Sequence, residues 1–316
     1  MTTTKPPNVL QADGVGLAEA TRVLAAGGTV AVPTETVYGL AARADSAESV
    51  AAIYRAKGRP DFNPLIVHVP DVAAAEALAM FDARARALSA AFWPGALTMV
   101  LPRRGDAPLA AAVSAGLPTV ALRVPAHPVM QALLVAAGLP LAAPSANRSG
   151  GISPTSAEHV AASLGGRVDL ILDGGNTEQG LESTIVAVRP DGSWAILRPG
   201  PIGEAEIAAL LGPHGPLASN SARIEAPGQL ASHYAPGKPV RLEACVAAAD
   251  EFLIGFGAVE GAISLSQRGD LAEAAARLYA CLHLAAAAPE PRIAVAPIPG
   301  DGIGAAINDR LRRAAA

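Results

Sequence analysis

Lysine is scarce in this sequence: of the 24 basic residues only Lys5, Lys57 and Lys238 are lysines, and the rest are arginines. Aromatic residues make up 3% of the chain and charged residues 16%. The formal net charge is −4, so no overall positive field exists to hold nucleic acid or an acidic membrane surface. Any site that binds an anion must therefore be a local arrangement of a few cations.

Cysteine is equally rare, with only Cys245 and Cys281, both in apolar stretches. Two separated cysteines cannot build a zinc site, and no secretory signal precedes them. We expect both to be buried thiols in a cytoplasmic protein. No membrane span is predicted, because charged residues, proline or glycine interrupt every apolar run before the ~18–20 residues that a span requires.

Apolar residues, in contrast, are abundant at 51%, and a length of 316 residues suffices for two domains. Over residues 1–212, strand-like segments alternate with helical patterns, which predicts an α/β fold with flanking helices. Some successive strands are separated by short, hairpin-like connections and others by longer crossovers, so we expect a twisted mixed sheet. Proline and glycine crowd residues 213–237, a segment too long for a passive connection. Residues 238–316 predict a smaller, Rossmann-like α/β domain.

Individual elements follow from periodicity and end signals. Predicted strands cover residues 29–32, 65–69, 97–101, 119–124, 139–143, 170–172, 184–188, 194–197, 240–242, 252–256, 263–265 and 293–295. Predicted helices cover residues 17–26, 71–80, 83–92, 127–137, 271–287 and 305–315. Ser46 is the expected N-cap of a helix that ends at Lys57. Thr155 and Glu158 predict a capping box for a helix to residue 164.

Lys57 and Arg59 stand two positions apart, where a helical run meets a loop interrupted by proline. A compact ammonium beside a planar guanidinium suits a polyphosphate, although a basic helix end that complements the helix dipole explains the pair equally well. The hydroxyl of Thr36 and the amide of Asn63 add hydrogen-bonding groups nearby. His68 closes an apolar strand, where an isolated histidine is more often structural.

Arg123 lies inside an otherwise apolar strand, where its charge is costly unless it meets an anion. An internal salt bridge is an equally good explanation. Ser183 precedes one strand and Arg198 ends the next. Because cationic and hydroxyl groups recur at the ends of adjacent strands, the sequence predicts a cleft there.

Small hydroxyls, an amide and paired glycines follow the strand that ends at Ala143. Their backbone N–H groups can form a phosphate or sugar cradle, and simple turn chemistry accounts for the same residues. The side chains concerned are Ser145, Asn147 and Ser153.

Residues 300–305 read Gly-Asp-Gly-Ile-Gly-Ala and formally fit a dinucleotide-binding fingerprint. No strand with an acidic residue follows before Ala316, so we expect a glycine-rich loop that caps the final helix. Asp309-Arg310 and Arg312-Arg313 are expected to form a solvated helix end.

A series of motifs, in conserved order along nearly the whole chain, resembles the YrdC-type threonylcarbamoyl-AMP synthases. They are residues 33–40 (PTETVYGL), Lys57-x-Arg59, Asn63-Pro64-Leu65 with His68, Pro94-Gly95-x-x-Thr98, Arg123-Val124-Pro125, Ser145-Ala146-Asn147, Glu182-Ser183-Thr184 and Leu197-Arg198-Pro199-Gly200. Residues 232–236 (SHYAP) and 302–314 resemble the long form, which has a YrdC-like domain and a C-terminal domain.

This resemblance implies that L-threonine, bicarbonate or CO2, and ATP with Mg²⁺ give threonylcarbamoyl-AMP and pyrophosphate. A downstream tRNA threonylcarbamoyl transferase complex would consume the product. Carried over by position, the threonine site comprises Thr36, His68, Arg123, Ala143 and Ser183. The ATP site comprises Arg59, Asn63, Thr119, Ser145, Asn147, Ser153, Arg198, His233 and Tyr234.

Within these sets the resemblance implies catalytic roles for Lys57 and Arg59 and a carboxylate-binding role for Arg123. No protein ligand to the metal is implied. His233 and Tyr234 would reach back from residues 213–237, which would act as a lid over the reactants.

Two other functional classes fit parts of the sequence. An RNA-binding module is disfavoured by the net acidity and the few aromatics, although direct tRNA binding stays open. A carbamoyl transferase that uses carbamoyl phosphate is disfavoured because larger proteins of that kind carry cysteine-rich zinc modules. A purely structural scaffold leaves the charged strand ends unexplained.

Overall fold

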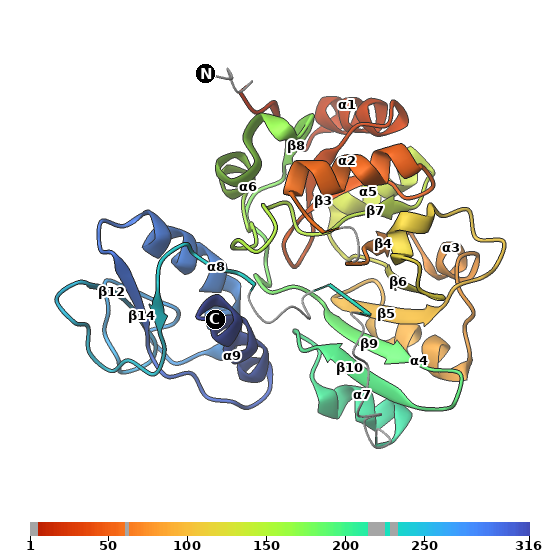
Figure 1. The fold of residues 1–316 in the computed structure, drawn as a ribbon. Coiled ribbons are helices and arrows are strands. Elements are labelled where there is room, and N and C mark those ends of the chain that lie inside the picture. The colour runs from red at the N-terminus through yellow and green to blue at the C-terminus, as the bar shows by residue number, and fades with distance from the viewer. Residues whose placement is uncertain (1–5, 61–62, 214–224, 228–232) are drawn as a thin grey trace.

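The computed structural model describes residues 6–60, 63–213, 225–227 and 233–316, which form two units, each built around its own sheet (Figure 1). The larger unit contains a ten-stranded sheet. In spatial order its strands are β1 (Val9–Gln11), β8 (Leu170–Asp173), β2 (Val30–Pro33), β3 (Tyr38–Arg43), β7 (Leu141–Ala142), β4 (Ile66–His68), β6 (Thr119–Arg123), β5 (Leu97–Pro102), β9 (Thr184–Val188) and β10 (Trp194–Arg198). Parallel and antiparallel pairs both occur, which confirms the predicted mixed sheet.

Two groups of helices cover this sheet. Helices α1 (Gly14–Ala25) and α5 (Pro128–Ala137) pack on the part formed by β2, β7 and β8. The largest hydrophobic cluster includes residues of α2 (Ala47–Lys57), α3 (Val72–Glu76), α4 (Ala83–Phe92), α6 (Ala157–Leu164) and α7 (Glu204–Leu211). Short 3₁₀ turns lie at Ala111–Ser114 and Gly165–Arg167.

Strand alternation decides which side chains reach the other face of the sheet, because successive residues of a strand point to opposite sides. In β6, Val120 and Leu122 join the large hydrophobic cluster. The alternate residue Ala121 packs instead with Ile66 and Ile185 in a small apolar strip on the opposite face. Arg123 follows Ala121 by two positions, so its side chain lies on the same face as this strip.

The smaller unit has four parallel strands in the order β11 (Val240–Arg241), β14 (Arg292–Val295), β12 (Glu251–Gly255) and β13 (Ile263–Ser264). Helices α8 (Leu271–Ala287) and α9 (Ile303–Ala314) lie between this sheet and the larger unit (Figure 1). Val37, Ile152 and Leu181 of the larger unit belong to the hydrophobic cluster of the smaller one. The predicted smaller α/β domain is therefore present, and its core is continuous with the larger unit.

End signals explain several boundaries. Ser46 accepts a hydrogen bond from Ser49 N and caps α2, as predicted, and Gly58 in the left-handed conformation ends that helix. Helix α6 is capped by Ser156, whose hydroxyl accepts from His159 N, so the predicted capping box at Thr155 is wrong by one residue. Helix α9 follows Gly302, in agreement with a glycine-rich loop before the last helix.

Other predictions need correction. Neither β3 nor α7 is predicted: β3 contains glycine and alanines of low β propensity, and α7 follows Gly203, which offers no capping side chain. The helix expected over 71–80 ends at Glu76, since Ala79 pairs with Arg103 in a β-bridge. Cys281 is buried, but Cys245 is exposed.

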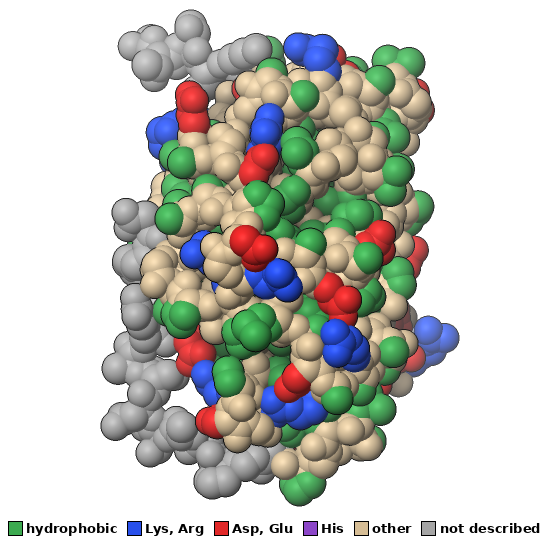
Figure 2. All heavy atoms as spheres, turned by 90° about the vertical axis from the view of Figure 1, so that its right-hand side faces the viewer, with side chains coloured by type: hydrophobic (Ala, Val, Ile, Leu, Met, Phe, Trp, Pro, Cys, Tyr) green, Lys and Arg blue, Asp and Glu red, His purple; other side chains and the backbone are tan. Residues whose placement is uncertain are grey.

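Part of the predicted lid over residues 213–237 lies outside the described residues, namely 214–224 and 228–232. None of the helices within the described ranges has the length and apolar character needed to cross a membrane. On the face shown in Figure 2, basic and acidic side chains are interspersed. Arg84 pairs with Asp82, and Arg86 pairs with Glu76, in ion pairs that are partly or fully exposed.

Candidate functional site

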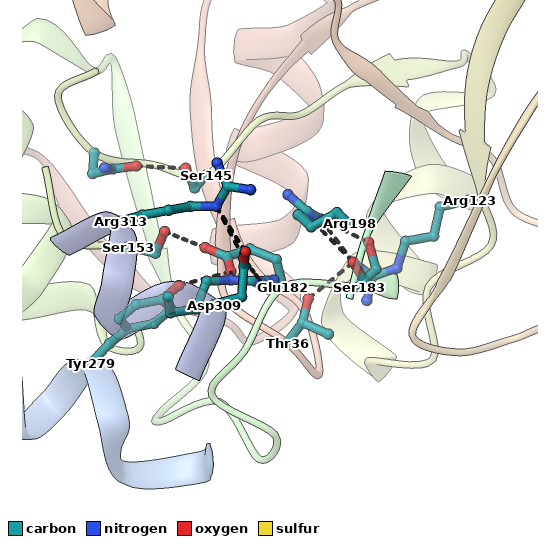
Figure 3. Close-up of polar contacts among 12 residues, drawn as sticks. Thr36, Arg123, Ser145, Ser153, Glu182, Ser183, Arg198, Tyr279, Asp309 and Arg313 are labelled. Carbon is teal, nitrogen blue, oxygen red and sulfur yellow. Dashed lines mark hydrogen bonds and ion pairs between the residues drawn. The ribbon is translucent and has the colours of Figure 1, made fainter. Parts of the chain in front are cut away.

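A cavity with about 530 Å³ of empty space, part of it open to solvent, lies on the sheet face that carries Arg123. Many predicted site residues line it: Thr36, Arg59, His68, Arg123, Ala143, Ser145, Ser183, Arg198, His233 and Tyr234. Glu182 and Pro227 line it as well. Residues spread over some 200 positions of the chain thus meet in one place, and Figure 3 shows several of them.

Arg123 stands at the end of β6 beside His68, its register partner at the end of β4. Its guanidinium donates to Gly95 O at 3.1 Å and to Thr36 Oγ1 at 3.0 Å. Its Nη2 lies 2.7 Å from Oε1 of Glu35, and both side chains are almost fully buried. Burial acts to raise the pKa of Glu35, but Arg123 outweighs it and the net shift is downward. The internal salt bridge expected as an alternative is therefore real.

His68 is buried in the cavity wall, and burial, with a further contribution from Arg123, lowers its pKa to about 3. Its imidazole is therefore neutral at physiological pH. Within the described part of the chain, its Nδ1 has no hydrogen-bond partner. A neutral imidazole at the wall is available to donate or accept a hydrogen bond from a polar ligand.

Arg198, at the end of β10, donates to the backbone oxygen of Ser183 at 3.0 and 3.1 Å and to its hydroxyl at 3.1 Å (Figure 3). The Ser183 hydroxyl also contacts Thr98 Oγ1 at 2.7 Å. Arg59 donates to Pro64 O at 3.0 Å and, more weakly, to Asn63 O at 3.4 Å. Both arginines are thus held by neutral oxygens.

Lys57 does not line the cavity; it supports the loop that does. Its ammonium donates to Asn147 O at 2.6 Å, to Asn147 Oδ1 at 3.3 Å and to Ser145 O. Ser145 Oγ in turn donates to Asn147 Oδ1 at 2.6 Å. Complete burial lowers the pKa of Lys57 well below its usual value, and Arg59 adds to this effect. Asn147 therefore lies behind the wall rather than in it.

Glu182 is a cavity-lining carboxylate to which the sequence analysis assigns no role. Ser153 donates to its Oε1, and Tyr279 and Arg310 donate to its Oε2 at 2.8 and 3.0 Å. Burial acts to raise the pKa of Glu182, but Arg310 and Arg198 hold it at about 2. Glu182 belongs to the Glu182-Ser183-Thr184 motif. Its partners on α8 and α9 lie about 100 or more positions away in the sequence, so no neighbouring residue indicates that Glu182 is paired.

Arg310 contradicts the expectation of a solvated helix end, because its side chain is 0% exposed. The helical spacing of Ala306, Ile307 and Ala314, all buried, places Arg310 on the apolar face of α9. That periodicity is the signal that predicts its burial. Arg312 is exposed, as expected.

His233 and Tyr234 reach the cavity from residues 213–237. His233 N donates to Arg313 O at 3.1 Å, which ties this segment to α9. The ring of Tyr234 stacks on Tyr279 with centroids 5.6 Å apart and lies 4.2 Å from the ring of His233. Burial lowers the pKa of His233 to about 3, so this imidazole is also neutral.

Thr119 is not among the residues that line this cavity. It begins β6, four residues before Arg123, and therefore lies about 13 Å away along the strand. It lines a separate hollow together with Ala187 and Glu225. Between the two positions lies the apolar strip of Ile66, Ala121 and Ile185, on which Ala226 packs.

The charges around the cavity do not balance. Glu35 is paired with Arg123 and Glu182 with Arg310. Among the described residues, no carboxylate forms an ion pair with the buried cations Arg59, Arg198 or Lys57. Nor does the described part of the chain contain a cluster of three or more histidine, cysteine or acidic side chains suited to a metal ion. The cavity is therefore built to receive a ligand that carries negative charge.

Fold and cavity together define a two-unit α/β protein whose larger unit carries a cavity lined by arginines, hydroxyls and an imidazole. A family model for Sua5, YciO and YrdC proteins, described as "Telomere recombination", matches residues 22–200. A second, described as "Threonylcarbamoyl-AMP synthase, C-terminal domain", matches residues 202–316. The chain belongs to the threonylcarbamoyl-AMP synthase family, in its long two-domain form.

Individual relatives match over nearly the whole length. The threonylcarbamoyl-AMP synthase of Bacillus subtilis is 40% identical, over 95% of this chain and 92% of its own. The threonylcarbamoyl-AMP synthase of Pyrococcus abyssi is 37% identical, over 91% of this chain and 90% of its own. The crystal structure of P. abyssi Sua5 complexed with L-threonine superposes with a TM-score of 0.88, at 33% identity, covering 98% of this chain and 97% of that one.

Proposed function

We propose that this protein makes threonylcarbamoyl-AMP from L-threonine, bicarbonate or CO2, and ATP, releasing pyrophosphate. One observation carries the proposal: three buried cations, Lys57, Arg59 and Arg198, form no ion pair with a carboxylate of the described residues and lie beside a pocket of hydroxyls, a neutral imidazole and an arginine. The first feature suits a triphosphate and the second suits a small hydroxy amino acid. The relatives in this family carry the name of that activity.

The amino acid is assigned to the end of the cavity formed by Thr36, His68, Arg123, Ala143 and Ser183. Arg123 binds the threonine carboxylate, since its guanidinium is the charged donor at this end. The hydroxyls of Thr36 and Ser183 stand within hydrogen-bonding reach of arginines. They are placed to recognise the polar groups of the substrate.

The nucleotide is assigned to the side of Arg59 and Arg198. Burial lowers the pKa of Arg59 to about 10, with Arg198 contributing, so neither cation is fully compensated in the protein alone. A triphosphate supplies the missing negative charge. Ile66, which belongs to the apolar strip, lines the cavity on this side and offers an apolar contact for the purine ring.

Mg²⁺ enters with ATP. The two carboxylates next to the cavity, Glu35 and Glu182, are each paired with an arginine, so neither is available as a metal ligand. Magnesium coordinated by phosphate oxygens and water fits this donor set. Bound with ATP, the ion would neutralise part of the charge on the phosphates, while the residues of the chain position the reactants.

The reaction needs a dry site. The neutral amine of threonine adds to the carbon of CO2 and loses a proton to water or to a phosphate oxygen, which gives a carbamate that decomposes in water. A carbamate oxygen then attacks the α-phosphorus, and the bond from that phosphorus to the bridging oxygen breaks so that pyrophosphate leaves. Fixed cations stabilise the charge that develops on the phosphate oxygens, a role that fits Arg59 and Arg198. Lys57 holds the Ser145–Asn147 loop against this region and adds its charge to the local potential.

The product is a mixed anhydride that is itself reactive, so a second enzyme must accept it promptly. We assign that role to a tRNA threonylcarbamoyl transferase complex in the cytoplasm. The interspersed charges on the face in Figure 2 offer no extended basic surface for RNA on that side.

The test is release of pyrophosphate from ATP, measured with and without threonine and bicarbonate. Release that requires both supports the proposal, and release that requires neither identifies a generic ATPase and overturns it. Replacing ATP and bicarbonate by carbamoyl phosphate tests the carbamoyl transferase alternative. Binding of RNA that falls steeply with salt and is indifferent to threonine identifies an RNA-binding module.

A further inference from the structure

The smaller unit supplies a charged partner to a carboxylate that lines the catalytic cavity. Glu182 lines that cavity and is buried, and its Oε2 lies 3.0 Å from Nε of Arg310. The two residues are 128 positions apart and belong to different units. The charge of a cavity residue is thus neutralised across the boundary between the units.

Arg310 has no contact with solvent, and it is the largest fully buried side chain of the described structure. Its Nη1 lies 2.9 Å from Oδ2 of Asp309, while its Nη2 has no hydrogen-bond partner in the described ranges. Its guanidinium also lies over the ring of Tyr234, 5.4 Å from the centroid, within the range of a cation–π contact. One side chain therefore contacts both a cavity carboxylate and a cavity ring.

A second residue of the smaller unit reinforces this arrangement. Tyr279 of α8 donates its hydroxyl to Glu182 at 2.8 Å (Figure 3). The ring of Tyr279 also stacks on that of Tyr234. Ser153 donates to the other oxygen of Glu182. The carboxylate consequently accepts from three donors, two of which come from α8 and α9.

The cavity needs this neutralisation if it is to hold a triphosphate. Glu182 is close enough to Arg198 and Lys57 to influence their pKa values. Left unpaired, the carboxylate would cancel part of the positive charge that these cations present and would repel the phosphates. Arg310 removes this conflict without itself being a lining residue.

We propose that Arg310 is a positioning residue of the catalytic cavity: from the smaller unit, it neutralises Glu182 and supports the ring of Tyr234, so that ATP meets uncompensated cations. This inference rests on the proposed function and gives the C-terminal unit a direct part in nucleotide binding.

The experiment compares three variants of the full-length chain, Arg310→Met, Glu182→Gln and the double variant, with Arg312→Met as the matched control. Arg312 lies on the same helix and is exposed. Calorimetric titration with ATP in the absence of threonine measures affinity, and steady-state kinetics measure KM for ATP and for threonine separately.

Arg310→Met leaves Glu182 unpaired, so the affinity for ATP should fall by about tenfold or more, while KM for threonine changes less than about threefold. Adding Glu182→Gln removes the unpaired charge and should restore most of the ATP affinity. Arg312→Met should behave as the wild type. A merely structural role for Arg310 predicts no such rescue.

An unchanged ATP affinity in Arg310→Met overturns the proposal, and so does a double variant that binds ATP no better than the single one. If Arg310→Met does not fold, the double variant provides the test, because it contains no unpaired charge. The proposal then requires the double variant to fold and to bind ATP nearly as tightly as the wild type. ATP titration does not depend on turnover. If ATP binding follows these predictions but pyrophosphate release ignores threonine and bicarbonate, the proposed function fails and the role of Arg310 stands.

Discussion

Glu35 Oε1 lies 2.7 Å from Nη2 of Arg123, and neither side chain exposes more than 5% of its surface. The arginine assigned to the threonine carboxylate therefore already has an internal anion. Because Glu35 neutralises Arg123, this part of the site carries no net charge before the zwitterionic amino acid enters. The carboxylate of the substrate must then share the guanidinium with Glu35.

Replacing Glu35 by Gln should lower the free energy of unfolding by about 3–5 kcal/mol, because it leaves a buried arginine without its counter-charge. Urea denaturation measures the loss. Asp45→Asn is the matched control: Arg43 and Asp45 are 2.9 Å apart but partly exposed, and breaking such a pair costs about 0–1 kcal/mol. Equal losses in the two variants would contradict the assignment of Glu35–Arg123 as a buried pair.

Arg59→Gln should weaken ATP binding by about tenfold to a hundredfold, the loss of a charge-assisted hydrogen bond, and leave threonine binding nearly unchanged. Calorimetry with each ligand separates the two effects. Arg55→Gln, on the exposed face of the preceding helix α2, should leave both affinities as they are. A loss of threonine affinity as large as that for ATP would place Arg59 in the wrong subsite.

Lys57→Gln should loosen the loop of Ser145–Asn147, because the ammonium links two of its backbone oxygens to the end of α2. Hydrogen exchange of the amides from Ser145 to Gly151 should become faster. Lys238 offers a control, since it makes the same kind of contact with Ala285 O and Ala288 O at the end of α8. Lys238→Gln should accelerate exchange only in the smaller unit, and unchanged exchange around Ser145 in Lys57→Gln would refute the supporting role.

Gly180→Ala should disturb the contact between the two units. A Cβ at Gly180 would lie 2.4 Å from Ala276 O and 2.6 Å from Ala275 O of α8. Gly192 also has a positive φ, but a Cβ there meets nothing within 4 Å. Both substitutions introduce the strain of a positive φ, but only a Cβ at Gly180 clashes with α8. Gly180→Ala alone should therefore also reduce pyrophosphate release. Matching activities in the two variants would show that this close approach is unimportant.

Stability should fall as the pH drops below about 6.5, because buried histidines stay neutral in the folded state. Burial lowers the pKa of His68 and His233 to about 3 and that of His283 to about 4, below the 6.5 of the unfolded chain. The unfolded state then binds more protons, and each histidine contributes up to about 1.4 kcal/mol of loss per pH unit.

Urea denaturation at pH 7.5, 6.5 and 5.5 measures this slope. His283→Gln removes one of the three histidines and leaves the cavity lining unchanged. The slope of its unfolding free energy against pH should therefore be smaller than that of the wild type by the contribution of up to one proton. A slope identical to that of the wild type would mean that His283 titrates normally in the folded protein.

Much of the fold follows from the sequence. The ends of β4, β6 and β9 and the N-cap of α2 are local properties, set by alternation and by the side chain of Ser46. For the same reason the sequence places His68, Arg123 and Ser183 at strand ends. It does not predict β3, whose residues form a strand because β2 and β7 supply its hydrogen bonds.

The sequence by itself determined which residue types stand at the strand ends, and that they suit an anion such as a polyphosphate; the amino acid was implied by the resemblance to a known family. Only the tertiary structure decided which charges remain uncompensated there. Glu35 and Glu182 pair with arginines on other strands and in the other unit, and Thr119 is separated from the cavity by the length of β6. Pairing between distant segments depends on sheet order and packing, which no local pattern of residues specifies.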